Sequence, residues 1–273
     1  MQSTSSESGI RLVVFDWAGT VVDHGSIAPI AALVAAFDEL GLDLSEAEAR
    51  KPMGLNKRDH IAAILNSPVV VDQWTSAFGK PPTQADGDAL YERFLPLQAQ
   101  TALGRTAVIP GVVECTRELR KRGIKMGTTT GYPTAIGSPV AASARTQGFE
   151  PDHCVFPDEV SAGRPAPWMI FRNMEHARVD SPAAVLKVGD TVPDIEEGRN
   201  AACWSVGITE TGSEIGMDLD DWRALPAAEQ AQRSNAAAKT LLSAGAHAVI
   251  PSVAQLPSFI DELNQRLGRG ERP

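Results

Sequence analysis

Short apolar runs alternate with amphipathic stretches along most of this chain, and the alternation predicts strands followed by helices. The first run, Leu12 to Phe15, is uninterrupted and has the length of a short buried strand. Similar runs recur from residue 108 onward, separated by stretches whose apolar residues fall on one helical face. This order predicts an α/β fold with a doubly wound, mainly parallel, Rossmann-like sheet. The further predicted strands are 124–128, 154–156, 184–188, 204–208 and 247–250, and the predicted helices are 110–122, 133–147, 165–176, 193–201 and 253–267.

A different pattern separates the first strand from the others. Between residues 25 and 104 the apolar positions recur at helical spacing, and no segment has the composition of a strand. The pattern predicts an α/β core of residues 1–24 and 105–273, interrupted by an all-helical insert of residues 25–104. Open α/β sheets bind ligands at the carboxyl ends of their strands, so an insert in this position is placed to act as a lid. A polar, Ala-rich helical excursion is also expected at 210–245.

The composition is that of an ordinary globular protein and limits the choice of partners. The hydrophobic fraction of 43% is typical of soluble domains, and no apolar run is long enough to cross a bilayer. The net charge of −9, without any stretch rich in Lys and Arg, argues against nucleic acid. Three distant cysteines predict neither a disulfide framework nor a zinc cluster, and the Ser-rich residues 1–9 lack the features of a signal peptide. We therefore expect a soluble, cytoplasmic protein with a small-molecule substrate.

Polar groups follow several predicted strands at the point where the apolar pattern stops. They are Asp16, the run Thr128 to Tyr132, the segment Glu159 to Arg164, and Asp190 with Asp194. Each alone is a common turn residue. Because the carboxyl ends of parallel strands meet at one edge of a sheet, together they bring carboxylates, a hydroxyl and a guanidinium to the same place. Such a set suits phosphoryl transfer, with Asp16 as a nucleophile or a metal ligand.

The carboxylates predict a divalent metal ion. Asp16 and Asp190 would repel each other, and Mg²⁺, which prefers carboxylate and water ligands, would offset that repulsion and bridge to phosphate oxygens. Asp194 has two interpretations of equal weight. It either orients a metal-bound water or serves the turn at the start of a helix.

The remaining polar groups of this edge suit a phosphoryl group. Thr130 is expected to hydrogen-bond a phosphoryl oxygen, and Arg164 is expected to neutralise developing charge. Lys187 competes with Arg164 for this role. It precedes the strand end, however, so we favour Arg164.

A second candidate site lies within the helical insert, in the segment Lys51 to His60. Lys57 and His60 are three positions apart and Met53 precedes Lys57 by four, so all three share a face if the helix begins by Met53. A lysine whose pKa is lowered by burial or by a nearby cation can attack a carbonyl carbon to form a Schiff base, and a histidine can carry the protons. The alternative is a solvated lysine on an exposed helix face.

The ordered motifs of the core resemble those of the haloacid dehalogenase superfamily of phosphotransferases. They are Asp16-Trp17-Ala18-Gly19-Thr20, Thr130-Gly131, Arg164 and Gly189-Asp190-Thr191-Val192-Pro193-Asp194. The helical insert resembles the cap domain of this superfamily. The resemblance implies that Asp16 is the nucleophile and forms an aspartyl-phosphate, and that Mg²⁺ is bound by Asp16, Asp190 and the backbone carbonyl of Ala18.

One departure from the superfamily pattern is informative. Most of its phosphatases carry a second Asp two residues after the nucleophile as an acid and base for the leaving oxygen, whereas this chain has Ala18, which cannot move a proton. A Schiff base at Lys57 would make that acid unnecessary. A carbon–phosphorus bond resists cleavage because the departing carbon would be a carbanion, but beside an imine its electron pair flows into the C=N bond and an enamine leaves instead.

With Ala18 and the Lys57 segment, the chain resembles the family within this superfamily that hydrolyses phosphonoacetaldehyde to acetaldehyde and phosphate in 2-aminoethylphosphonate degradation. The resemblance implies a substrate site lined by Met53, Gly131 and Tyr132. Ser26 is a departure, because some members have Cys near this linker. The family also suggests a homodimer formed through the cap. An apolar stripe in residues 29–40 could serve this contact, or it could pack internally.

Two other functions stay open on sequence grounds. One is a phosphate-monoester phosphatase or phosphomutase of the same superfamily, against which Ala18 argues. The other is a catalytically inactive relative with a binding or regulatory role, which the complete set of motifs disfavours. Turnover of sugar phosphates without need of Lys57 would indicate the first, and a folded, Mg²⁺-loaded protein that turns over neither substrate would indicate the second.

Overall fold

Six parallel strands form the centre of the computed structural model, which describes residues 9–273. The order across the sheet is β3-β2-β1-β4-β5-β6, so the first strand of the chain is central. The predicted parallel α/β sheet is thus confirmed, and no predicted strand end differs from the observed one by more than one residue. The predicted lead-in at residues 1–9 lies outside the described residues except for Gly9. The strands are β1 (Leu12–Phe15), β2 (Lys125–Thr129), β3 (His153–Val155), β4 (Val185–Gly189), β5 (Trp204–Ile208) and β6 (Ala248–Ile250).

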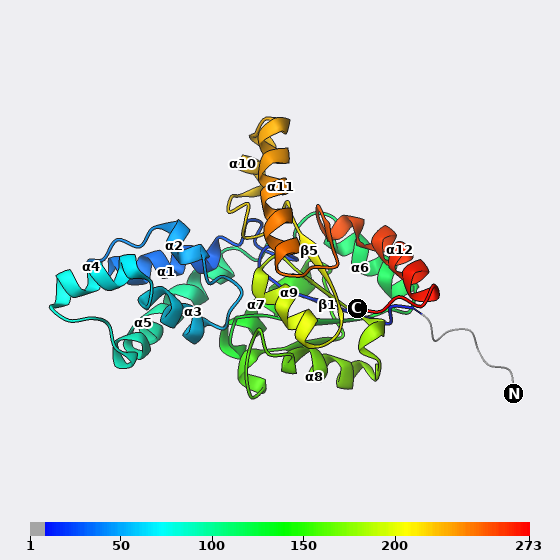
Figure 1. The fold of residues 1–273 in the computed structure, drawn as a ribbon, viewed down its shortest axis with the longest axis horizontal. Coiled ribbons are helices and arrows are strands. Elements are labelled where there is room, and N and C mark those ends of the chain that lie inside the picture. Colours follow the sequence, from blue (N-terminus) through cyan, green and yellow to red (C-terminus); the bar gives the residue numbers. More distant parts are fainter. Residues whose placement is uncertain (1–8) are drawn as a thin grey trace, which may run out of the picture.

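Helices cover both faces of this sheet (Figure 1). Side chains of β1 alternate between the faces: Val13 and Phe15 join the larger apolar cluster, and Leu12 and Val14 the smaller one. The predicted excursion at 210–245 forms two helices, and the longer of them, α11, projects from the top of Figure 1. The helices of the core are α6 (Val112–Lys121), α7 (Thr134–Thr146), α8 (Trp168–Ala177), α9 (Val192–Asn200), α10 (Leu219–Ala224), α11 (Ala227–Ser243) and α12 (Leu256–Gly268), with 3₁₀ turns at Pro157–Glu159, Pro182–Ala184 and Val253–Gln255.

The helical insert lies at one end of the sheet, at the left of Figure 1. Within residues 25–104, all of which the structure describes, no strand occurs. Most of the buried apolar residues of its helices form a cluster of their own, whereas Ala102, near the end of the last of these helices, belongs to the larger cluster of the core. Ile30, Leu33 and Phe37 belong to that cluster, so the apolar stripe packs internally, and the homodimer, which stays a prediction, would need another surface. The helices are α1 (Ala28–Asp38), α2 (Glu46–Arg50), α3 (Lys57–Leu65), α4 (Pro68–Phe78) and α5 (Gln84–Leu103).

The helix that carries Lys57 begins after Met53, at Lys57 itself. Asn56 has an extended backbone, and its side chain accepts a hydrogen bond from the Asp59 N–H, so Asn56 caps α3 and Lys57 is its first residue. Gly54, with a φ of 93°, prevents the helix from extending back to Met53. The condition under which Met53 would share a helical face with Lys57 and His60 is therefore not met, because Met53 lies in the turn before the helix.

That turn, residues 51–56, packs directly against loops of the core. A Cβ atom on Gly131 would lie 2.6 Å from the carbonyl oxygen of Leu55, and one on Gly54 would lie 2.1 Å from the hydroxyl of Thr191. Glycine is therefore required on each side of the contact: Gly131 lies against the backbone of Leu55, and Gly54 lies against the side chain of Thr191. The insert is thus seated on the carboxyl ends of β2 and β4.

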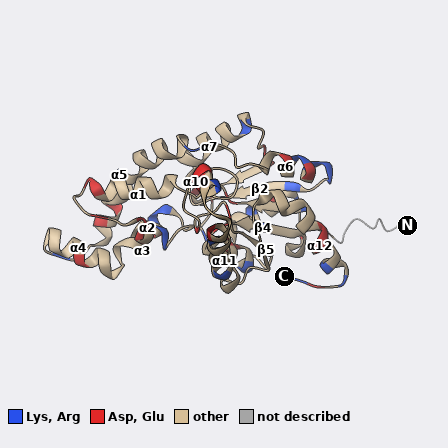
Figure 2. Cartoon of the chain, turned by 90° about the horizontal axis from the view of Figure 1, so that it is seen from above, with Lys and Arg blue, Asp and Glu red and all other residues tan. Residues whose placement is uncertain are grey.

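Charged residues are distributed over both parts of the chain. In Figure 2 the positions of acidic and basic residues are interspersed along the described helices, and α6 carries both signs. Of the helices that the structure describes, none is both long enough and apolar enough to span a membrane.

Candidate active site

Asp16 lies at the carboxyl end of the central strand. Phe15 pairs with Thr128 of β2 and with Val188 of β4, so the residues that follow these three meet at one level of the sheet edge. The Asp16 carboxylate is 6% exposed, and Oδ1 accepts a hydrogen bond of 2.7 Å from Nη2 of Arg164. Burial raises the pKa of Asp16 and outweighs the opposing effect of the Arg164 charge.

The turn after Asp16 is shaped around Asp190. Gly19 has a φ of 84°, and a Cβ atom there would lie 2.5 Å from Oδ2 of Asp190. The Thr20 hydroxyl donates to Oδ1 of Asp190 at 2.8 Å, and the Ser213 N–H donates to Oδ2 at 2.8 Å. These contacts fix the Asp190 carboxylate beside the backbone of residues 18–20.

Three buried carboxylates converge at this point. Ligand oxygens of Asp16, Asp190 and Asp194 lie within 4.8 Å of one another. Burial, together with the negative charges of Asp16 and Asp194, raises the pKa of Asp190 well above its ordinary value. A group of carboxylates held so close without solvent fits a hard divalent cation, whose charge would stabilise all of them in the ionised form.

Asp194 is committed to contacts with the protein. Oδ1 forms ion pairs with Arg164 at 2.8 Å and Lys187 at 2.9 Å, and Oδ2 accepts a hydrogen bond from the Thr191 hydroxyl at 2.5 Å. Burial alone would raise the pKa of Asp194, but the two cations lower it. Of the two interpretations drawn from the sequence, these contacts favour the structural one, at the start of α9.

Sequence reasoning missed Glu197, which completes the network. Its Oε2 accepts hydrogen bonds from the Thr129 hydroxyl at 2.9 Å and Nε of Arg164 at 3.1 Å, and it pairs with Lys187 at 3.1 Å. The available signal was its spacing, since Glu197 follows Asp194 by three residues and shares its face of α9. Lys187 is fully buried among these groups, whereas Arg164 also reaches the cavity described below.

Arg164 is held from three sides by carboxylates. Its guanidinium contacts Asp16, Asp194 and Glu197 and is 2% exposed. Burial alone would lower the pKa of Arg164, but the carboxylates raise it, so the group stays charged. It is therefore a fixed cation beside Asp16.

Lys57 enters the same region from the helical insert. It is 5% exposed, and its Nζ lies 5.7 Å from the centroid of the Tyr132 ring. Burial lowers the pKa of Lys57 to about 8, against the opposing effect of the Asp16 charge. The solvated-lysine alternative is inconsistent with this burial, and a neutral amine is accessible to Lys57 near physiological pH.

His60 lies one turn further along α3. It is fully buried, and its Nε2 donates a hydrogen bond of 2.8 Å to the carbonyl oxygen of Ala49. Burial and the charge of Lys57 lower the pKa of His60 to about 3, so the ring is neutral. Its Nδ1 has no hydrogen-bond partner among the described residues, which leaves one basic nitrogen free.

These side chains meet around a small space between the insert and the core, here called the inner cavity. Its volume is about 20 Å³, close to that of one water molecule. His60 and Asp190 do not line it. The structure therefore brings together most of the predicted catalytic and substrate-contacting residues. The lining residues are Asp16, Ala18, Ser26, Pro29, Met53, Gly54, Lys57, Thr130, Gly131, Tyr132, Arg164 and Thr191.

A larger hollow, here called the outer cleft, adjoins the inner cavity. It has a volume of about 740 Å³ and lies between residues 56–59 of the insert and residues 157–166 of the core. Lys57, Gly131 and Arg164 line both spaces, so the cleft and the inner cavity are neighbours.

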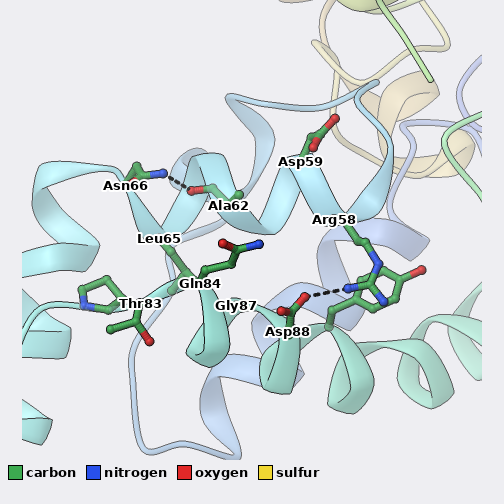
Figure 3. A pocket seen from close by; sticks show the side chains of 11 residues that line it. Arg58, Asp59, Ala62, Leu65, Asn66, Thr83, Gln84, Gly87 and Asp88 are labelled. Carbon is green, nitrogen blue, oxygen red and sulfur yellow. Dashed lines mark hydrogen bonds and ion pairs between the residues drawn. The ribbon is translucent and has the colours of Figure 1, made fainter. Parts of the chain in front are cut away.

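A separate pocket of about 460 Å³ lies within the insert between α3 and α5 (Figure 3). Arg58 lines one end of it, donates a hydrogen bond of 2.7 Å to Asp88 and lies over the Tyr91 ring. None of the residues predicted to act in catalysis, substrate binding or metal binding lines this pocket. The inner cavity is therefore the better candidate for chemistry.

Comparisons with known proteins agree with this geometry. A family model described as haloacid dehalogenase-like hydrolase matches residues 10–202. A curated protein of Paraburkholderia xenovorans named phosphonoacetaldehyde hydrolase is 44% identical over 97% of this chain and 99% of its own length. A second of the same name, from Klebsiella pneumoniae, is 42% identical with the same coverage. A crystal structure from Oleispira antarctica, described as a phosphonoacetaldehyde hydrolase-like protein, matches with a TM-score of 0.96 and 38% identity, covering 100% of this chain and 99% of that one.

Proposed function

The chain belongs to the haloacid dehalogenase-like hydrolases and, among them, to the phosphonoacetaldehyde hydrolase family, and we propose that it hydrolyses the carbon–phosphorus bond of phosphonoacetaldehyde. The products would be acetaldehyde and phosphate, a step in 2-aminoethylphosphonate degradation. One observation carries the proposal. A buried lysine of lowered pKa and a buried strand-end aspartate line the same cavity, and the residue two positions after that aspartate is Ala18.

Lys57 would activate the substrate. Its neutral amine attacks the aldehyde carbon, water leaves, and an imine joins the substrate to Nζ. His60, one turn away on α3, stays the predicted proton carrier of these steps, although in the described conformation its ring is neutral and does not line the inner cavity. Tyr132, whose pKa burial raises well above its ordinary value, keeps its proton and packs beside the amine.

Asp16 would then take the phosphoryl group. Its carboxylate attacks phosphorus while the carbon–phosphorus electron pair moves into the imine, so that an enamine leaves and an aspartyl-phosphate forms. Arg164 and the hydroxyl of Thr130 would stabilise the phosphoryl oxygens, since both line the cavity. Water then hydrolyses the aspartyl-phosphate, and protonation and hydrolysis of the enamine release acetaldehyde and Lys57.

Mg²⁺ fits the carboxylates described above. Asp16 and Asp190, with the backbone carbonyl of Ala18, would hold it, because Asp194 is already engaged with Arg164 and Lys187. Bound there, the ion would neutralise negative charge on the phosphoryl oxygens. The raised pKa of Asp190 supports this assignment, because a buried carboxylate of that kind gains most from a cation.

The helical insert would serve as a cap over the active site. The proposed boundaries are residues 25–104 for the cap and residues 1–24 and 105–273 for the core, and the separate apolar cluster of the insert supports them. An inner cavity of about 20 Å³ cannot admit a substrate as large as phosphonoacetaldehyde, so the cap must move to let it enter. The described conformation is a closed one.

Borohydride trapping tests the Schiff base. Reduction in the presence of phosphonoacetaldehyde should give one stable adduct, located on Lys57 by peptide mass mapping. Because the protonated amine is not a nucleophile, the trapping rate should fall as the pH is lowered through about 8. Adducts confined to other lysines would refute the proposal, and efficient turnover of sugar phosphates without Lys57 would favour a phosphatase instead.

Glu197→Gln tests the buried network behind Arg164. The neutral amide removes one of the charges that orient Arg164 and Lys187, and we expect kcat/KM for phosphonoacetaldehyde to fall by about 10- to 100-fold. Glu196→Gln, the half-buried neighbour on the same helix, is the matched control and should retain activity. Thermal unfolding of both variants separates misfolding from a catalytic defect. Equal kcat/KM for the two variants would show that Glu197 does not position Arg164.

A further inference from the structure

Lys57 and Asp16 have separate tasks in the proposed reaction. The imine at Lys57 supplies the electron sink, and Asp16 serves only to accept the phosphoryl group. A leaving group that departs without being transferred to an acceptor would need the electron sink at Lys57 but would not need Asp16. A carboxylate attached to the same carbon is such a group, because it leaves as carbon dioxide.

We propose that the inner cavity also decarboxylates short 3-oxocarboxylic acids. The smallest of these acids is 3-oxopropanoate, whose oxo group is an aldehyde. The inference rests on the proposed function, since it requires imine formation at Lys57. It goes beyond that function because Asp16 takes no part in the chemistry.

The charges of the inner cavity place the two ends of such a molecule. Lys57 reaches in from the insert, and Arg164 and Thr130 lie on the core side. A substrate carboxylate would take the place of the phosphonate beside Arg164, whose guanidinium is fixed and 2% exposed. At the same time the aldehyde carbon would face the Lys57 amine.

The size of the cavity favours a small acid. A planar carboxylate occupies less space than a tetrahedral phosphonate, so 3-oxopropanoate requires less displacement of the cap than the proposed substrate does. Met53, Pro29 and Tyr132 form apolar walls around the space. These walls leave no room for a long or branched chain. An apolar environment also favours decarboxylation, because the localised negative charge of the carboxylate is dispersed toward the iminium as the bond breaks.

The bonds and electrons of the reaction balance without any added oxidant or reductant. Nζ of Lys57 attacks the aldehyde carbon, water leaves, and a protonated imine forms. The bond to the carboxylate breaks, its electron pair becomes the enamine C=C bond, and the C=N electrons return to nitrogen. Carbon dioxide departs, the enamine carbon takes a proton, and water releases acetaldehyde and Lys57. The sum is 3-oxopropanoate and one proton giving acetaldehyde and carbon dioxide.

Asp16 distinguishes the two reactions. Its negative charge lies beside Arg164, where it disfavours a second carboxylate. Asp16→Asn removes that charge and keeps an oxygen that can accept from Arg164. Decarboxylation in this variant should therefore equal or exceed that of the unmodified protein, whereas carbon–phosphorus cleavage should be lost.

The experiment measures acetaldehyde from 3-oxopropanoate with the full-length protein, its Asp16→Asn variant and its Lys57→Arg variant. The spontaneous rate without protein is subtracted, and Lys51→Arg, an exposed lysine of the same insert, controls for general amine catalysis. We expect decarboxylation in the unmodified protein, Asp16→Asn and Lys51→Arg, and only the background rate in Lys57→Arg. Chelation of divalent metal should reduce phosphonoacetaldehyde hydrolysis more than decarboxylation.

The outcomes separate this inference from the proposed function. If borohydride traps 3-oxopropanoate on Lys57 but no acetaldehyde forms, the decarboxylation is refuted and the Schiff-base hydrolase stands. If neither compound is trapped on Lys57, both are refuted. If decarboxylation is present but is lost in a folded Asp16→Asn variant, Asp16 takes part in it and the division of tasks is wrong.

Discussion

Replacing Lys57 with Arg is expected to lower kcat/KM for phosphonoacetaldehyde by at least about 10⁴-fold. An arginine side chain keeps the positive charge and a similar reach, but its guanidinium stays protonated and forms no imine under these conditions. Without the imine the departing carbon would be a carbanion, and Ala18 offers no proton to help it leave. Acetaldehyde release, coupled to its reduction by an alcohol dehydrogenase, measures the loss directly.

The matched control is Lys51→Arg, which makes the same substitution six residues earlier. The Lys51 side chain is 66% exposed and pairs with Glu48, so its replacement should leave kcat/KM unchanged. Thermal unfolding of the Lys57 variant shows whether the larger guanidinium disturbs the closed cap. A folded Lys57→Arg protein that keeps even a tenth of the activity would contradict covalent catalysis at this residue.

The strands and the position of Asp16 could be predicted from the sequence because both depend on local patterns. A continuous apolar run of four residues indicates a strand buried on both faces, and β1 is fully buried between two neighbours. Asp16 follows where that run stops, so its place at the sheet edge required no knowledge of the rest of the fold. The internal packing of α1 was one of two alternatives, and only the contacts of Ile30, Leu33 and Phe37 decide between them.

The buried network behind Arg164 could not be predicted in the same way. Arg164 meets Thr129, 35 residues earlier in the chain, and Glu197, 33 residues later. Such pairings depend on how helix α9 and strand β2 are arranged in space, and hydrophobic periodicity contains no information on that. The start of α3 depends instead on local features, since Asn56 caps the helix and Gly54 breaks the helical pattern before it.

Asp16→Asn is expected to reduce carbon–phosphorus cleavage by at least about 10⁴-fold while leaving imine formation at Lys57 intact. The amide cannot accept a phosphoryl group, yet it has nearly the same shape and can still accept the hydrogen bond of Arg164. The imine should therefore form, and the reaction should stop at that stage. Borohydride then reduces a substrate that still contains phosphorus, whereas the unmodified protein gives mainly the adduct of acetaldehyde.

The composition of that adduct assigns the roles more sharply than rates alone. Asp180→Asn provides a folded control in which the acetaldehyde adduct should persist. Asp180 forms an exposed ion pair with Arg11, at the end of the core sheet opposite to the carboxyl ends of the strands. An adduct without phosphorus in Asp16→Asn would mean that another group attacks phosphorus. A folded variant that gives no adduct would mean that Lys57 depends on the Asp16 carboxylate to react. Only an adduct that contains phosphorus is consistent with the proposed division, in which Lys57 of the insert and Asp16 of the core act on different bonds of one substrate.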